Sequence, residues 1–178
     1  MSRVTVNTAL GPFRFRMYED RAPATCRHFS SVIQSGAFDD ASVFRIVAAK
    51  NHAPGEPNPI EVVQLGPRGC IDSEHEPVPH ESTHDTGIRH QRGTVSAARV
   101  NLNQLFGSFF VCMRNEPALD FGATRHPDRQ GFAAFGQVES GFDTLERIME
   151  CAETSDFLER EIPILSVTID SPDDADER

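Results

Sequence analysis

The sequence has 178 residues, of which 27 are acidic and 17 are lysine or arginine, so its formal net charge is −10 at pH 7. This charge argues against nucleic acid or an anionic membrane as a partner and favours a soluble, self-repelling protein, which we expect to be a monomer. The length suits one domain with a single core. Because no apolar run reaches membrane-spanning length or forms a signal segment after Met1, we expect cytoplasmic residence.

The N-terminal part of the chain predicts a β-hairpin followed by a helix. Alternating apolar residues over 4–8 and 13–17, with a turn at Gly11, are typical of two paired strands. Pro23 suits the first turn of a helix, and Gly36 is a residue at which a helix commonly ends. Between them, apolar residues recur at helical spacing: Ala22, Cys26, Phe29 and Ile33.

Later apolar runs predict further strands, at residues 43–47, 60–65, 93–99, 107–112, 132–138 and 162–169. Consecutive residues of a strand point to opposite faces, so Phe109 and Phe110 cannot both enter one core. One of them is expected to line a second apolar surface, such as a pocket. Pro163 is compatible only with the start of the last strand, because proline cannot donate a ladder hydrogen bond.

The run over residues 43–47 contains a single arginine among apolar residues. Strand alternation places Val43, Arg45 and Val47 on one face, so the guanidinium would emerge beside apolar neighbours at the rim of a pocket. The residues alone favour the simpler alternative, an arginine that points outward from an edge strand.

A second amphipathic helix is expected from Phe142 to Cys151, after the turn at Gly141. Long polar connections rich in proline, glycine and histidine occupy residues 48–91, apart from the strand at 60–65, and residues 115–131. Residues 171–178 form an acidic tail.

Neither disulfides nor a metal site are predicted. The four cysteines show no C-x-x-C spacing, so free thiols are expected, and Cys26 and Cys112 lie in apolar patterns typical of core residues. Four histidines of the connection over residues 48–91 lie close together in sequence without an H-E-x-x-H pattern, and we interpret them as solvated side chains: His75, His80, His84 and His90.

Several segments resemble, in order and spacing, the signatures of the cyclophilin family of peptidyl-prolyl isomerases: Gly93–Ala98, Gly107–Cys112, Leu119–Asp120 and Phe135–Val138. The likeness extends to about residues 3–170. It implies a mainly β fold, a closed antiparallel eight-stranded β-barrel capped by two α-helices, as a single domain over residues 1–170 before the tail. Since the barrel of this family is packed, its ligand site is expected on the outer face.

The resemblance also implies peptidyl-prolyl cis-trans isomerase activity on Pro-containing polypeptides during protein folding, with no cofactor and no metal. Arg45 matches the catalytic arginine of the family, which donates a hydrogen bond to the prolyl nitrogen. Gln64 matches a glutamine that positions substrate and arginine, and Phe110 and Leu119 match the floor and wall of the proline pocket. The remaining substrate-binding positions implied by the resemblance are Val62, Ala98, Arg99, Ser108 and Phe132.

Departures from the usual family residues carry expectations of their own. Glu61 replaces an aromatic residue and would pair with Arg45 if it faced the pocket. Ser108 replaces a glutamine, so contacts to the substrate backbone should be looser unless Arg99 compensates. Ala118 stands where some members have a tryptophan, and weak or absent cyclosporin binding is therefore expected.

Three functions are compatible with these observations. Arg45 and Gln64 favour an active isomerase, whereas Glu61 and Ser108 favour a non-catalytic cyclophilin-like module that binds Pro-containing segments. The third function is a small β-barrel ligand carrier, which we disfavour because the order of the family motifs would then be a coincidence. We favour the isomerase.

Overall fold

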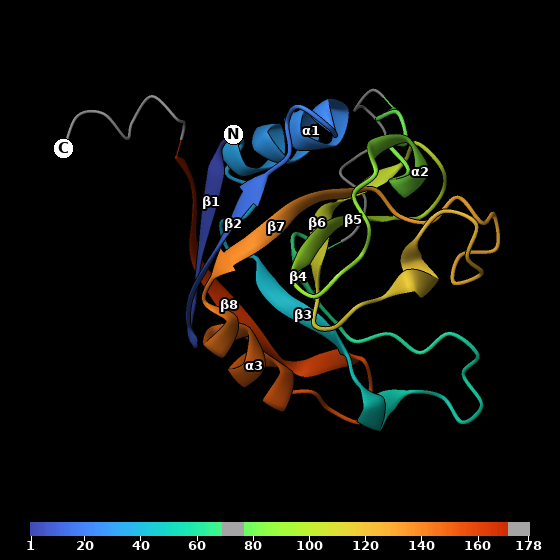
Figure 1. Cartoon of the computed structure of the whole chain (residues 1–178). Helices are drawn as coiled ribbons and strands as arrows, with labels where there is room; N and C mark the ends of the chain where they lie inside the picture. Colours follow the sequence, from blue (N-terminus) through green and yellow to red (C-terminus); the bar gives the residue numbers. More distant parts are fainter. Residues whose placement is uncertain (69–76, 171–178) are drawn as a thin grey trace.

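Eight antiparallel strands close into a barrel in the computed structural model, which describes residues 1–68 and 77–170 (Figure 1). The strand order around the barrel is β1-β2-β7-β5-β6-β4-β3-β8. A closed ladder leaves no unpaired sheet edge, and the predicted barrel is confirmed. The strands are β1 (Arg3–Thr8), β2 (Gly11–Met17), β3 (Ser42–Val47), β4 (Val62–Gly66), β5 (Thr94–Arg99), β6 (Leu105–Cys112), β7 (Ala134–Ser140) and β8 (Phe157–Asp170).

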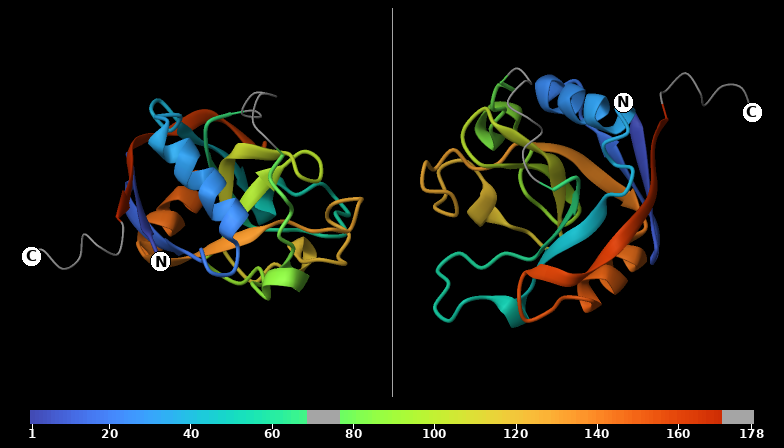
Figure 2. Two further views of the ribbon diagram at one scale, coloured as in Figure 1. Left: turned by 90° about the horizontal axis from the view of Figure 1, so that it is seen from above. Right: turned by 180° about the vertical axis from the view of Figure 1, so that it is seen from behind.

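Helices α1 (Pro23–Gln34) and α3 (Phe142–Glu150) cover opposite ends of the barrel (Figures 1 and 2). Both were predicted, and α1 begins with its proline and ends before Gly36, whose φ of +79° suits glycine. Over residues 1–68 and 77–170, no helix combines the length and the hydropathy of a membrane span.

A third helix, α2 (Thr83–Thr86), was not predicted. It is a single turn whose preceding residue, Ser82, accepts a hydrogen bond from the Asp85 amide, and Gly87 ends it with a φ of 67°. Two 3₁₀ turns, η1 (Ala49–Asn51) and η2 (Pro117–Leu119), also lie in the connections. Elements this short contain no apolar repeat from which they could be recognised.

Aromatic side chains fill the interior of the barrel. Phe29 of α1 stacks on Phe135 of β7 at 4.5 Å between ring centroids, and Phe15 of β2 meets Phe109 edge to face at 5.3 Å. At the other end, Leu145 of α3 is fully buried. This filled interior argues against the ligand-carrier alternative.

The two phenylalanines of β6 separate as predicted. Phe109 belongs to the interior core, whereas Phe110 belongs to a second apolar cluster on the outer side of the barrel. Strands β4 and β5 flank β6 and contribute to the same outer cluster. The members of this outer cluster are Val47, Ile60, Val62, Ala98, Phe110, Cys112 and Leu119.

Cys26 and Cys112 are buried and free, as predicted, while Cys151 is exposed. Burial raises the pKa of the Cys26 thiol to about 12, so this group is a neutral packing residue. Cys70 and His75 lie outside the described residues.

Strict alternation along β3 was a wrong prediction. Val43 and Ile46 point into the interior core, whereas Val47 belongs to the outer cluster. The reason is a bulge between Val43 and Arg45, which shifts the register against both β4 and β8. The extra residue keeps Arg45 on the outer side even though Val43 faces inward.

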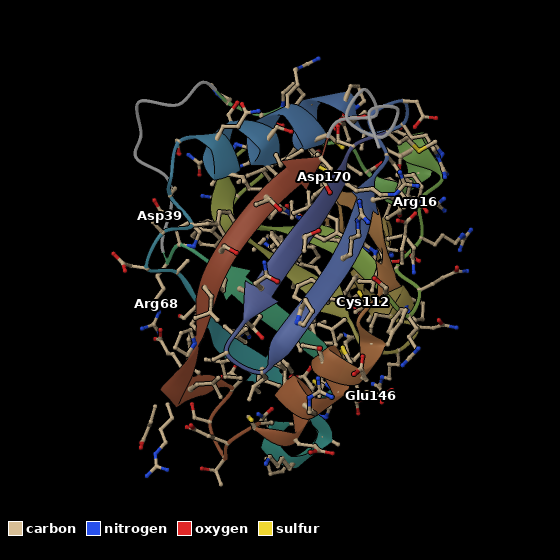
Figure 3. All side chains as sticks on the ribbon, turned by 90° about the vertical axis from the view of Figure 1, so that its left-hand side faces the viewer. Arg16, Asp39, Arg68, Cys112, Glu146 and Asp170 are labelled. Carbon is tan, nitrogen blue, oxygen red and sulfur yellow. The ribbon has the colours of Figure 1, made fainter. Side chains whose placement is uncertain are left out.

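The prediction that Pro163 stands at the start of the last strand was also wrong. Pro163 lies in the middle of β8. Residues Phe157 to Pro163 pair with β3, and residues Ile164 to Asp170 pair with β1. Because Pro163 stands where the strand changes partner, its missing N–H costs little pairing. Figure 3 shows the face on which β8, β1 and β2 run side by side.

We expect Phe109→Ala to lower the free energy of unfolding by about 3–5 kcal/mol, because it opens a cavity among packed aromatic rings. Leu165→Ala is the control, since Leu165 is 69% exposed, and should change stability by less than about 0.5 kcal/mol. Urea unfolding measures both, and a similar small effect for the two variants would contradict the packing described here.

Candidate active site

A hollow of about 150 Å³ lies over the outer cluster. Strands β3, β4, β5 and β6 provide its base, and the connection that contains η2 provides a wall. Of the nine residues predicted for the site, all except Ser108 line it. The lining residues are Arg45, Ile60, Val62, Gln64, Ala98, Arg99, Phe106, Phe110, Leu119, Arg125 and Phe132.

The base of the hollow is apolar. Phe110 is 5% exposed and meets Phe132 edge to face at 5.7 Å between centroids, and Leu119 is almost fully buried beside them. A hollow of this size and polarity suits a small apolar ring and has a polar rim at Arg45 and Gln64.

Arg45 stands on the rim with its guanidinium held from one side by Asp156. Its Nε donates to Asp156 Oδ2 at 2.8 Å, and Nη2 lies 2.8 Å from the same oxygen. Nη1 points toward Gln64 Oε1 at 3.4 Å, a long contact that leaves this edge of the fork available. The Arg45 side chain is 27% exposed, so it is neither sealed in an ion pair nor turned away from the hollow.

Asp156, and not Glu61, is the acidic partner of Arg45. Glu61 lies one residue before β4 and turns away from the hollow, so that its carboxylate is 3.7 Å from Arg114. The condition under which Glu61 would pair with Arg45, that it faces the hollow, is therefore not met. Strand alternation explains this, because Val62, the next residue, is the one that faces the hollow.

Ser108 lies behind Gln64 and is 1% exposed. The Gln64 Nε2 donates to Ser108 Oγ at 3.1 Å, which orients the amide so that its oxygen faces Arg45. Ser108 therefore acts on the rim through Gln64 rather than by lining the hollow.

Arg99 supports the wall of the hollow from within. Its buried guanidinium donates to both carboxylate oxygens of Asp128 at 2.8 Å and to the Gly131 carbonyl at 3.0 and 2.7 Å. The guanidinium also lies over the Phe132 ring at 5.2 Å and holds the pKa of Asp128 well below its usual range. These bonds direct the fork into the wall, which argues against Arg99 compensating for Ser108.

Three lining residues and the partner of Arg45 were not predicted from the sequence. Phe106 shares a face of β6 with Phe110, so the alternation that singled out Phe110 would have found it. Ile60 and Arg125 lie in irregular connections, and Asp156 precedes a strand far along the chain. Nothing in the local sequence marks Arg125 or Asp156, whereas Ile60 shares by alternation the face of Val62 and Gln64 in the strand predicted at 60–65.

A buried polar group lies beneath the base of the hollow, and its histidine, His90, was wrongly predicted to be solvated, since it is only 2% exposed. His90 Nδ1 is 2.8 Å from Asp120 Oδ1, Nε2 is 2.8 Å from Ser96 Oγ, and the imidazole stacks on Phe110 at 6.2 Å. This order of serine, histidine and carboxylate resembles a hydrolase triad, but Ser96 is 0% exposed, so no substrate can reach its hydroxyl. The group supports Phe110 from behind.

Burial lowers the pKa of His90 because an imidazolium would lose its hydration. Because the Asp120 carboxylate can only accept, the neutral ring donates a hydrogen bond from Nδ1 to Asp120 and accepts one at Nε2 from the Ser96 hydroxyl. Among residues 1–68 and 77–170, no group of three or more metal-ligating side chains was found.

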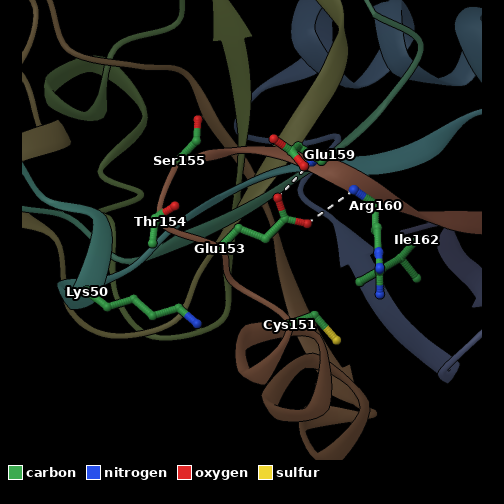
Figure 4. A pocket seen from close by; sticks show the side chains of 8 residues that line it. All are labelled: Lys50, Cys151, Glu153, Thr154, Ser155, Glu159, Arg160 and Ile162. Carbon is green, nitrogen blue, oxygen red and sulfur yellow. Dashed lines mark hydrogen bonds between the residues drawn. The ribbon is translucent and has the colours of Figure 1, made fainter.

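A wider hollow of about 690 Å³ lies between the end of α3 and the start of β8 (Figure 4). Its Glu153 carboxylate accepts backbone hydrogen bonds from Glu159 at 2.8 Å and from Arg160 at 3.1 Å. The Glu153 carboxylate therefore ties the segment between α3 and β8 to the first part of β8. Of the described residues that line this hollow none is aromatic, whereas Phe106, Phe110 and Phe132 line the smaller one.

Comparisons with known proteins agree with the geometry. A family model described as "Cyclophilin type peptidyl-prolyl cis-trans isomerase/CLD" matches residues 3–169. The peptidyl-prolyl cis-trans isomerase cyp18 of Streptomyces antibioticus is 26% identical over 172 residues, which are 96% of this chain and 97% of the relative. CYP18-2 of Arabidopsis thaliana is 28% identical and is matched over 82% of this chain and 79% of its own.

Solved structures share the fold. A cyclophilin-type isomerase of Cryptosporidium parvum superposes with a TM-score of 0.76 at 19% identity, covering 96% of this chain and 98% of the other. A second structure from that organism, determined in the presence of the dipeptide Ala-Pro, has a TM-score of 0.75 at 20% identity, covering 95% and 99% of the two chains.

We expect the buried His90 to make stability depend on pH. The unfolded histidine takes up a proton near its ordinary pKa of about 6.5, whereas the folded one resists until lower pH, so the free energy of unfolding should fall as the pH drops from about 7 to about 5. His90→Gln should reduce this slope, while His84→Gln, at an exposed position, should leave it unchanged. Equal slopes for all three proteins in urea titrations would contradict the assignment.

Proposed function

Because the chain belongs to the cyclophilin-type peptidyl-prolyl cis-trans isomerase family, we propose that it accelerates rotation about Xaa-Pro bonds with Arg45 as its catalytic residue. The observation that carries this proposal is the position of the Arg45 guanidinium at the rim of an apolar hollow floored by Phe110. The hollow would receive the proline ring, and Pro-containing polypeptides are the substrates.

The chemistry requires neither a nucleophile nor proton transfer. Amide resonance opposes rotation with a barrier of roughly 18–20 kcal/mol, and uncatalysed Xaa-Pro exchange takes on the order of tens to hundreds of seconds. As the bond twists, the prolyl nitrogen regains its lone pair and becomes a better acceptor. A donor aimed at this nitrogen therefore binds the twisted state more tightly than either planar isomer.

Arg45 is suited to that role because its donor is charged and its position is fixed. The bulge in β3 brings it to the rim, Asp156 holds Nε and Nη2, and Gln64 lies beside Nη1. A tenfold acceleration corresponds to about 1.4 kcal/mol, so roughly 10⁴-fold requires about 5.4 kcal/mol of preferential binding. A charged hydrogen bond together with a rigidly placed substrate is on that scale.

The other lining residues divide into two groups. Val62, Ala98, Leu119 and Phe132 would contact the proline ring and its neighbours through apolar surface, and the Gln64 amide would meet the substrate backbone. Ser108 and Arg99 would act as positioning residues, the former on Gln64 and the latter on the wall that ends at Phe132.

A binding module without appreciable catalysis is the second candidate. The observation that favours it is the Arg45–Asp156 ion pair, because a carboxylate 2.8 Å from the guanidinium draws part of its charge away from a substrate. Both side chains of the pair are partly exposed, at 27% and 32%, so water screens their attraction, and Nη1 is not bonded to the carboxylate. We therefore favour the catalyst.

We expect the protein to accelerate cis-trans exchange in an Ala-Pro or Phe-Pro tetrapeptide, measured by NMR exchange spectroscopy. Arg45→Ala should lower kcat/KM by about 10- to 100-fold, the loss expected for one charged hydrogen bond. Arg14→Ala, which removes an exposed arginine outside the lining of the hollow, is the matched control and should have no effect. Saturable binding without exchange would support the binding module instead.

Asp156 offers a separate test of how Arg45 is held. Asp156→Ala frees Nε and Nη2, so kcat should fall by about 5- to 10-fold with KM little changed, since orientation is lost rather than binding surface. Asp156→Asn keeps an acceptor oxygen and should stay within about twofold of the original protein. If Asp156→Ala were faster than the original protein, the carboxylate would be an inhibitor of Arg45 and not its support.

A further inference from the structure

Three arginines of the described chain line the hollow, and they differ in how their donors are used. Arg99 directs its fork at Asp128 and Gly131, and Arg45 directs two of its nitrogens at Asp156. Arg125 contacts the Asn58 carbonyl at 3.1 Å and Glu56 at 3.4 Å, both through Nη1. Its Nε and Nη2 have no partner among residues 1–68 and 77–170, and its side chain is 22% exposed.

The segment that carries Arg125 is fixed at several points. Asn58 Nδ2 donates to Thr124 Oγ1 at 2.9 Å, the Gly122 amide donates to the Arg129 carbonyl at 2.8 Å, and Asp128 accepts both hydrogen bonds from buried Arg99. The Arg125 guanidinium is therefore held beside the hollow before any ligand arrives. Such preorganisation lowers the entropy lost on binding.

The open donors suit a carboxylate. A guanidinium presents two parallel N–H groups that match the two oxygens of a carboxylate, and the apolar residues Ile60 and Phe132 of the same lining reduce competition from water. Glu56 is a weak competitor, because its contact to Nη1 is long and its carboxylate also accepts from the Asn58 amide at 3.2 Å.

We propose that Arg125 is a specificity-determining residue that binds a carboxylate next to the proline of the substrate, so that the enzyme prefers Pro-containing segments with an acidic neighbour. The carboxylate can belong to an Asp or Glu side chain or to a chain terminus directly after proline, and the two share the same chemistry. This inference rests on the proposed function, because it assumes that the hollow receives the proline ring.

The test uses capped peptides acetyl-Ala-Xaa-Pro-Yaa-amide with Glu or Gln at Xaa or at Yaa, together with an uncapped peptide that ends at proline. For each Glu/Gln pair, NMR exchange gives the ratio of kcat/KM values and NMR titration gives the ratio of dissociation constants. We expect a ratio of about 5 to 20 in favour of the carboxylate in at least one peptide, as one charged hydrogen bond would supply. The ratio should decrease as salt is added.

Arg125→Gln should bring that ratio to about one, because the loss falls on the acidic peptide. A purely structural role of Arg125 would lower both members of a pair equally and leave the ratio unchanged, which would overturn the proposal. Glu56→Gln should raise the ratio by removing the competing carboxylate. Arg92→Gln, a change of charge outside the lining of the hollow, is the control and should leave the ratio as it is.

The peptide arms identify the source of the carboxylate, since a preference at Xaa or Yaa indicates a side chain and a preference limited to the uncapped peptide indicates a terminus. Ratios near one in every arm for the unaltered protein would overturn the proposal. If the protein binds the peptides without accelerating exchange, the proposed catalytic function fails, while the ratio of dissociation constants still decides the role of Arg125.

Discussion

One irregularity in a strand controls the position of the residue on which the proposed chemistry depends. Without the bulge between Val43 and Arg45, alternation would give Arg45 the same side as Val43, which is the barrel interior. With the bulge, the guanidinium stands on the outer surface while Val43 and Ile46 still pack inside. The bulge interrupts the regular hydrogen bonding of β3 at one residue, and it places the Arg45 charge at the edge of an apolar surface instead of in the core.

Strand β6 joins the two apolar regions of the molecule. Phe109 packs inside the barrel against Phe15 and Phe29, and Phe110 forms the base of the outer hollow. The His90 group stiffens that base from behind, since the imidazole is bonded at both nitrogens and stacks on Phe110. The base of the hollow is therefore built on the same sheet that defines the core.

The sequence was informative where its signals are local or follow the order of the family motifs. The barrel, the two larger helices and the division between Phe109 and Phe110 could all be predicted, and the predicted site residues other than Ser108 meet around one hollow. The bulge in β3 and the change of partner at Pro163 depend on pairing with distant strands. The local sequence therefore gave the wrong face for Val43 and the wrong place in its strand for Pro163. Asp156 and Arg125 reach the hollow from connections whose path only the folded chain defines.

The pairing of β1 with β8 also bears on how the molecule is made. Arg3 lies opposite Asp170, so the first and last strands of the described chain are neighbours in one ladder. A ribosome releases the N-terminal strand long before its partner exists, and the barrel cannot close until the whole span has emerged. Contacts between residues this far apart in sequence slow folding. Before they form, the backbone N–H and C=O groups of β1 that face β8 have no partner. Until β7 and β8 have been synthesised, the β1–β2 hairpin therefore has unpaired edges that can pair with strands of other chains.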